Sequence, residues 1–281
     1  MTSTRSTVTV TGLFIYPVKS LGGISLSEAD LTARGFKYDR EWLIVDRENH
    51  FVTQREIARM ALIATSIDEA ANCLTLRLPD QDTILSIPLT EVQKSDSKKK
   101  LETISVQVWN DRAEAYVESA EVNSALSRYL GQDLRLVRMA PGYRRQVDEH
   151  YAPGEDNIVG FADGFPFLII SDESLEDLNE RLEYPLPMNR FRPNITTRGG
   201  GPYAEDSWDK IKIAEVELAI VKPCARCVIT TIDQDCAEQG KEPLRTLANY
   251  RKKDSKILFG QNAIFKGSGH ISVGDTVSMK S

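Results

Sequence analysis

Apolar and polar residues alternate in short runs along most of this chain. Residues 7–11 alternate with period two and continue through residues 13–15 to Pro17, the pattern of a half-buried strand that ends at a proline. Comparable runs predict strands at residues 41–45, 60–67, 73–78, 83–89, 104–109 and 113–117. Strands this short and this closely spaced are typical of a β-barrel or a β-sandwich.

From residue 120 onward, the chain mixes helical and strand patterns. Residues 120–130 place their apolar side chains on one helical face, and Gly131 supplies a stop. A second helix is expected after Ser171, a good N-cap followed by two acidic residues, and a short third one near residues 243–250. Residues 195–197, 211–221 and 228–232 predict strands, and residues 269–277 predict two strand pieces around a Gly-Asp turn that could close a barrel. The expected class is mainly β with some helices (α+β).

A change of composition marks a candidate domain boundary. Residues 140–159 hold two prolines, two glycines, an Arg-Arg pair and several acids, with little apolar periodicity. A chain of 281 residues is long enough for two domains with cores of their own. We therefore expect domains at residues 1–140 and 141–281.

Composition narrows the classes of protein. The net charge is -6 with Lys and Arg spread along the chain, so a nucleic-acid partner is not expected. No run approaches the roughly 20 apolar residues that a membrane-spanning helix needs, and the N-terminus shows no apolar targeting segment, which predicts a cytoplasmic protein with no integral membrane segment. Four cysteines are too few for a disulfide scaffold.

The sharpest chemical motif is the pair Cys224 and Cys227, with Lys222 before it and Arg226 inside it. Nearby cations stabilise a thiolate, the form of cysteine that binds metals. A structural zinc site would need about four ligands, and no second pair stands at the usual spacing. A thioredoxin-type dithiol needs its first cysteine at a helix start, whereas the β-rich residues 228–232 follow here. An inert pair is the third alternative.

Three further segments carry cations suited to anion binding. Lys19 and Ser20 follow the first strand, with glycines just after them, and resemble a phosphate cradle without the spacing of a Walker A loop. Arg40 could pair with its acidic neighbours or clamp a ligand. Arg192 precedes Pro193, which favours an extended backbone and would hold the guanidinium at a rigid junction suited to phosphate or carboxylate.

Together, these motifs resemble the MOSC family over nearly the whole chain. The resemblance rests on the order of residues 16–20, 39–42, 191–194, 224–233 and 259–262, and residues 167–171 and 203–208 make it most similar to the amidoxime-reducing components. It implies an N-terminal MOSC β-barrel domain and a C-terminal MOSC domain with a molybdenum cofactor, Mo-molybdopterin, between them. The protein thiolate on the metal would be Cys227, a soft ligand suited to this metal.

The resemblance also implies the residues that hold the cofactor. They are Lys19, Ser20, Arg40, Asp163, Arg192, Asn194, Ala225, Arg226 and Cys227. Relatives carry small hydroxyl residues where this chain has Gly164 and Phe165, so a contact from those two positions would involve the backbone.

The implied activity is the reduction of N-hydroxylated substrates such as amidoximes, hydroxylamines and N-hydroxylated bases, bound in a cleft between the domains. The four cysteines cannot form a plant-type iron–sulfur cluster, so electrons are expected from a separate donor protein of cytochrome b5 or ferredoxin type with its reductase. One rival function is a non-catalytic cofactor carrier or sulfur-transfer module that uses Cys227 as a persulfide. A two-domain binding protein without a cofactor is another.

Overall fold

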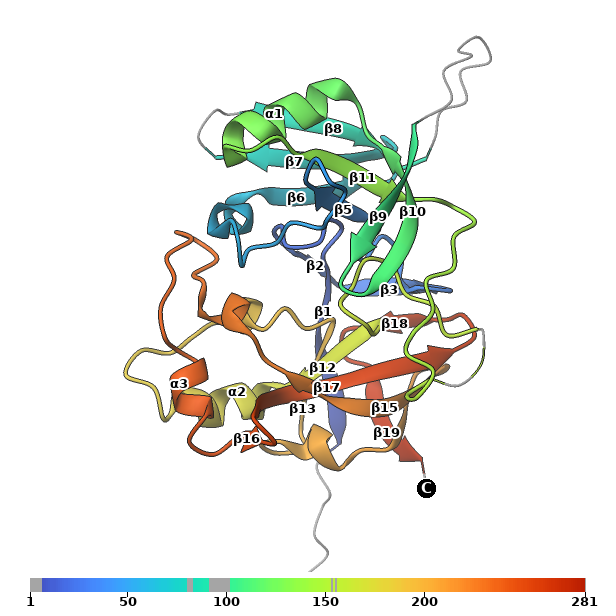
Figure 1. Cartoon of the computed structure of the whole chain (residues 1–281). Coiled ribbons are helices and arrows are strands. Elements are labelled where there is room, and N and C mark those ends of the chain that lie inside the picture. The colour runs from blue at the N-terminus through green and yellow to red at the C-terminus, as the bar shows by residue number, and fades with distance from the viewer. Residues whose placement is uncertain (1–6, 80–82, 91–101, 153, 155, 281) are drawn as a thin grey trace, which may run out of the picture.

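The computed structural model describes residues 7–79, 83–90, 102–152, 154 and 156–280. The chain forms two stacked bodies, with α1 on one and α2 and α3 on the other (Figure 1). The α-helices in the described residues are α1 (Ala120–Leu130), α2 (Asp172–Asn179) and α3 (Leu244–Leu247). The same residues also form the 3-10 helices η1 (Ala58–Leu62), η2 (Met188–Arg190), η3 (Ala204–Ser207) and η4 (Val228–Thr231).

The lower body in Figure 1 is a closed barrel. Within the described residues, seven strands follow one another around it: β12 (Phe167–Ser171), β13 (Ile195–Arg198), β1 (Val8–Ile15), β19 (Thr276–Lys280), β14 (Lys210–Ile213), β15 (Val216–Ala225) and β17 (Lys256–Lys266). Pairing of β12 with β17 closes the ring. Fully buried Leu13, Ile169 and Ile195 belong to its core. The expected β-rich class with a barrel is confirmed.

Short strands extend the barrel at its edges. β2 (Ile24–Leu26) pairs with β1, and β16 (Lys252–Lys253) pairs with β17. β3 (Glu28–Thr32) joins β4 (Gly35–Phe36) and β18 (His270–Ser272) in a separate small sheet. Strands β1 and β3 therefore pair with strands of the C-terminal half, β1 with β13 and β19 and β3 with β18, and a division at residues 140/141 would cut these pairings. That division stays a proposal.

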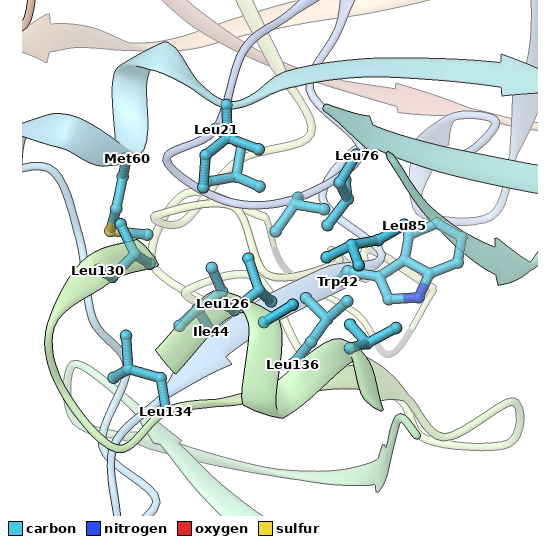
Figure 2. Packing of buried hydrophobic residues seen from close by; sticks show 14 of the residues in the cluster. Leu21, Trp42, Ile44, Met60, Leu76, Leu85, Leu126, Leu130, Leu134 and Leu136 are labelled. Atoms are coloured by element: carbon cyan, nitrogen blue, oxygen red, sulfur yellow. The ribbon is translucent and has the colours of Figure 1, made fainter. Parts of the chain in front are cut away.

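The upper body holds two smaller sheets and α1. One sheet has the order β5 (Trp42–Val45), β11 (Arg135–Met139), β10 (Asp111–Val117) and β9 (Thr103–Val108), and the other contains β6 (Ala64–Asp68), β7 (Cys73–Leu78) and β8 (Thr83–Pro88). The apolar face of α1 packs onto them through Leu126 and Leu130, next to Trp42 and Ile44 (Figure 2). Helix α1 has the bounds expected from the sequence, because Ser119 caps its start and Gly131, at φ 76°, ends it.

Removal of a large side chain from this core should be costly. Leu126 is fully buried, so Leu126→Ala should lower the free energy of unfolding by about 2–5 kcal/mol through the cavity that it leaves. Ser124→Ala, at an exposed position of the same helix, should change it by less than about 0.5 kcal/mol. Urea unfolding of both variants checks this, and equal shifts would contradict the packing assigned to α1.

Three expected strands take another form. The run at residues 60–67 begins inside η1, and only its second part is β6, because a continuous apolar run does not separate helix from strand. The run at residues 211–221 is a hairpin, with Ala214 at φ 49° in the turn between β14 and β15. The β-branched run after Cys227 forms η4 instead of a strand, because the hydroxyl of Thr230 donates to the Cys227 carbonyl and that of Thr231 to the Val228 carbonyl.

None of the helices in the described ranges is long and apolar enough to cross a membrane.

Candidate functional site

A cavity of about 620 Å³ lies where loops of both halves meet. Its walls include loops after β1 and β4, the β9–β10 turn, the segment before β12, the loop before β13 and the end of β15. All nine residues predicted from the family resemblance line this cavity: Lys19, Ser20, Arg40, Asp163, Arg192, Asn194, Ala225, Arg226 and Cys227. The fold thus brings together positions that are up to 208 residues apart in the sequence.

The cavity is cationic although the protein is acidic. Of the residues that the structure describes, seven Lys or Arg line it (Lys19, Arg40, Arg55, Arg145, Arg192, Lys222 and Arg226), against three carboxylates (Asp111, Asp148 and Asp163). The whole chain carries a net charge of -6. A concentration of positive charge in a concave site raises the local concentration of anions, so this cavity suits an anionic ligand.

The two cysteines of the motif face different guanidinium groups. Arg55 Nη2 lies 3.2 Å from Cys227 Sγ, whereas Arg226 Nη1 lies 2.9 Å from Cys224 Sγ. Both thiols are free and half-buried, and both residues line the cavity. Cys224 lies within β15, and Cys227 directly precedes η4. The expectation that a strand follows the pair is therefore wrong. A thioredoxin-type dithiol requires its first cysteine at the start of a helix, and Cys224 is not in that position.

Three of the predicted residues adopt a left-handed backbone. Their φ angles are 69° for Ser20, 51° for Arg40 and 56° for Arg192. This region is uncommon outside glycine, and such strain persists only where the surroundings impose it, often at functional sites. The extended backbone expected for Arg192 is wrong. The left-handed turn directs the Arg192 guanidinium over the ring of Tyr16, 4.1 Å from its centroid.

Arg40 and Arg192 share the buried ring of Tyr16. The Arg40 guanidinium lies 4.2 Å from the ring centroid, and its Nη1 donates to both carboxylate oxygens of Asp39 at 2.7 and 2.6 Å. Burial raises the pKa of Tyr16 to about 12, so its hydroxyl stays protonated and donates to the Pro193 carbonyl. The sequence left two roles open for Arg40, an ion pair with an acidic neighbour or a ligand clamp. The ion pair with Asp39 is present, and the side chain also lines the cavity, where it could contact a ligand.

The guanidinium of Arg192 has no hydrogen-bond acceptor among the described residues, and its contact is with the Tyr16 ring. Burial lowers the pKa of Arg192 to about 10, with the charge of Arg40 adding to the fall. The group is still protonated at neutral pH. A half-buried, charged guanidinium that lines a cavity in this state has its donors available for an anionic ligand.

Lys19 and Asp163 form an ion pair at the cavity wall. Lys19 Nζ donates to Asp163 Oδ1 at 2.5 Å and to the Phe161 carbonyl at 2.8 Å. Desolvation lowers the pKa of Lys19, and Asp163 opposes that fall. Desolvation raises the pKa of Asp163, but the charge of Lys19, helped by Arg55, outweighs this and holds the Asp163 pKa below its ordinary range. Asp163 therefore stays ionised at neutral pH, with Lys19 as its ion-pair partner.

The other predicted residues differ in how many of their polar groups are already used. The hydroxyl of Ser20 makes no hydrogen bond with any residue that the structure describes, so it can serve a ligand. The Asn194 amide donates to the Phe14 carbonyl and accepts from Leu168 N, both at 3.2 Å, which ties β12 to β1. Arg226 donates to the Phe191 carbonyl at 2.6 Å, while its buried Nε has no hydrogen-bond partner among the described residues.

Sequence reasoning missed Arg55, Arg145 and Trp109 as parts of the site. Arg145 is 3% exposed and donates to Asp111 Oδ2 and to the carbonyls of Gly160 and Ala162, so it fixes the loop that carries Asp163. Neither Arg55 nor Trp109 stands in a recognisable motif. Only the close packing of the two halves places them beside Cys227 and Asp163.

Comparison with known proteins identifies the family. The model of the MOSC domain matches residues 156–278, and that of the MOSC N-terminal beta barrel domain matches residues 7–133. The chain belongs to the MOSC family, which confirms the resemblance seen in the sequence.

Relatives align over nearly its whole length. Mitochondrial amidoxime-reducing component 1 of Homo sapiens is 37% identical, in an alignment that covers 96% of this chain and 82% of that protein. Mitochondrial amidoxime reducing component 2 of Homo sapiens is 35% identical with the same coverage of both chains. The molybdenum cofactor sulfurase of Oryza sativa subsp. japonica is 32% identical over 91% of this chain, which corresponds to 32% of that protein.

Proposed function

We propose that this protein is a molybdenum-cofactor-dependent oxidoreductase that reduces N-hydroxylated substrates such as amidoximes, hydroxylamines and N-hydroxylated bases. The observation that carries the proposal is the position of Cys227 in a cavity that is lined, among the described residues, by seven Lys or Arg side chains. One of these, Arg192, has no hydrogen-bond acceptor in that part of the chain. Relatives named as amidoxime-reducing components, which align with 96% of the chain, support this activity.

The residues of the cavity fit the molybdenum cofactor. No cluster of three or more His, Cys, Asp or Glu side chains that could hold a bare metal ion occurs in the described part of the chain. A metal bound here would depend on Cys227 and on ligands that it brings with it, as the dithiolene of a pterin cofactor would supply. Arg192, Ser20 and Lys19 would bind the phosphate and pterin end through hydrogen bonds assisted by charge. When bound, the cofactor supplies a two-electron redox couple that can cleave an N–O bond.

The protein's own side chains would position the cofactor and neutralise its negative charge. Arg55 holds the Cys227 thiol from the opposite half of the chain, and Arg145 fixes the loop that presents Asp163. Conversion of an amidoxime to an amidine consumes two electrons and two protons and releases water. We propose that the electrons come from a separate donor protein of cytochrome b5 or ferredoxin type. We also propose that the protein is cytoplasmic, although the two human relatives named above are described as mitochondrial.

Dependence on a donor protein gives a direct test. Purified, molybdenum-loaded protein should not convert benzamidoxime to benzamidine with NADH alone, since its four cysteines cannot form a plant-type iron–sulfur cluster that would pass electrons on. Addition of cytochrome b5 and its reductase should start turnover, which chromatography of benzamidine measures. Turnover with NADH and no second protein would contradict the separate donor, and no turnover with any donor would contradict the proposed activity.

Sulfur transfer is the second candidate, because the molybdenum cofactor sulfurase of rice is 32% identical over 91% of the chain. In that case Cys227 would carry a persulfide, and no stoichiometric metal would be needed. Metal analysis separates the two functions: the reductase should hold about one molybdenum per chain. A metal-free protein with one additional sulfur atom on Cys227 in its mass spectrum would favour sulfur transfer.

A further inference from the structure

Trp109 is an exposed aromatic residue that faces the cavity. It lies in the turn between β9 and β10 with φ 55°, a left-handed conformation that is uncommon for a bulky residue. Its side chain is 43% exposed, whereas the two other tryptophans, Trp42 and Trp208, are buried. A strained backbone that keeps a large ring out of the core, at the wall of a cavity, indicates a role in ligand contact.

Three neighbours hold the Trp109 ring in place. Its Nε1–H donates to Asp163 Oδ1 at 3.1 Å, the guanidinium of Arg55 lies 4.8 Å from the ring centroid, and Phe51 packs edge-on at 4.9 Å. The indole is thus fixed by hydrogen bonding, a cation–π contact and an aromatic contact, although much of it is open to the cavity. A ring held in this way loses little conformational freedom when a ligand packs on it.

These neighbours place the ring between the Lys19–Asp163 ion pair and the Cys227 thiol. Asp163, which accepts the indole N–H, also accepts from Lys19. Arg55, which lies over the ring, also contacts the Cys227 thiol at 3.2 Å. One side chain, that of Arg55, therefore separates Trp109 from the position proposed for the metal, and the indole itself contacts Asp163, one of the residues expected to hold the cofactor. The ring thus lines the same cavity as Cys227, with Arg55 in contact with both.

We propose that Trp109 is a specificity-determining residue that contacts the substrate and favours planar, conjugated N-hydroxylated compounds, such as aryl amidoximes, over aliphatic ones. This inference rests on the proposed reductase function and names its preferred substrate class. The exposed part of the indole offers a flat apolar surface to a second π system, and an aromatic contact is worth more than the burial of equal apolar area. Phe165, also in the cavity wall, adds a second aromatic surface.

Two substrates and two variants test this role. Benzamidoxime and acetamidoxime carry the same reacting group and differ in a phenyl ring against a methyl group. Trp109→Phe and Trp109→Leu both remove the hydrogen bond to Asp163, but only the phenylalanine retains an aromatic face. The ratio of kcat/KM for benzamidoxime to that for acetamidoxime should stay within about twofold of wild type in Trp109→Phe and fall about five- to tenfold in Trp109→Leu, through KM.

The outcomes separate this inference from the proposed function. Wild-type protein that reduces neither amidoxime would contradict the function, and calorimetric binding of both compounds to the molybdenum-loaded protein without a donor would then decide the inference. Tighter binding of benzamidoxime that is lost in Trp109→Leu and kept in Trp109→Phe would support it. Equal losses for both compounds, or an unchanged ratio in Trp109→Leu, would overturn it, and the molybdenum content of each variant identifies any loss that comes from the cofactor.

Discussion

Replacement of Cys227 by serine should abolish benzamidoxime reduction and lower the molybdenum content. A serine hydroxyl is a hard ligand and stays protonated at neutral pH, so it cannot replace a soft thiolate on the metal. The fold should survive, because a hydroxyl can still accept the hydrogen bond from Arg55. Molybdenum analysis, reduction assays with the donor system and urea unfolding of the same preparation measure the three effects.

Cys224→Ser is the matched control for this change. Cys224 lies on the same cavity wall and contacts the neighbouring cation Arg226, and a serine can accept from that guanidinium too. Most of the activity and metal should therefore remain. A zinc site or a redox dithiol would need both cysteines, and an inert pair would need neither. Equal loss from the two substitutions would overturn the assignment of Cys227 as the single thiolate ligand.

Elements with local determinants could be predicted from the sequence to the residue. Helix α1 is the example, because its apolar period, the Ser119 cap and the Gly131 stop all lie within 13 residues. The strand β17 was missed: Gly260, Gln261 and Asn262 interrupt its apolar pattern, and its length depends on pairing with both β12 and β15. The segment η4 differs in the opposite direction: its residues have high strand propensity, but they form a 3-10 helix because threonine hydroxyls donate to carbonyls three residues before them.

The candidate site could be predicted as a set of residues but not as a set of contacts. The family resemblance named nine positions that the fold gathers in one cavity, whereas the local sequence alone left Arg40 open to an ion pair with its acidic neighbours. The interactions of Arg55 with Cys227 and of Trp109 with Asp163 join the two halves of the chain across gaps of 172 and 54 residues. No local pattern encodes such contacts, because they depend on how the halves pack.

The difference between Arg192 and Lys19 matters for the fold as well as for the ligand. Lys19 neutralises Asp163 and supports the Phe161 carbonyl, so its removal leaves a carboxylate with less compensation at the cavity wall. Arg192 supports no acceptor in the described part of the protein. We therefore expect Lys19→Ala to lower both cofactor retention and the free energy of unfolding, whereas Arg192→Ala should act mainly on retention.

Arg192→Ala should weaken retention of the molybdenum cofactor about ten- to a hundredfold, because each lost hydrogen bond to a charged group costs roughly 1.5–3 kcal/mol. Arg47→Ala is the control: Arg47 is exposed, pairs with Asp133 and lies outside the cavity lining, so its loss removes one positive charge without touching the site. Pterin fluorescence after denaturation, together with molybdenum content after dialysis, measures occupancy in both variants. Unchanged occupancy in Arg192→Ala would show that its guanidinium serves no anionic cofactor, and an equal loss in Arg47→Ala would reduce the effect to net charge.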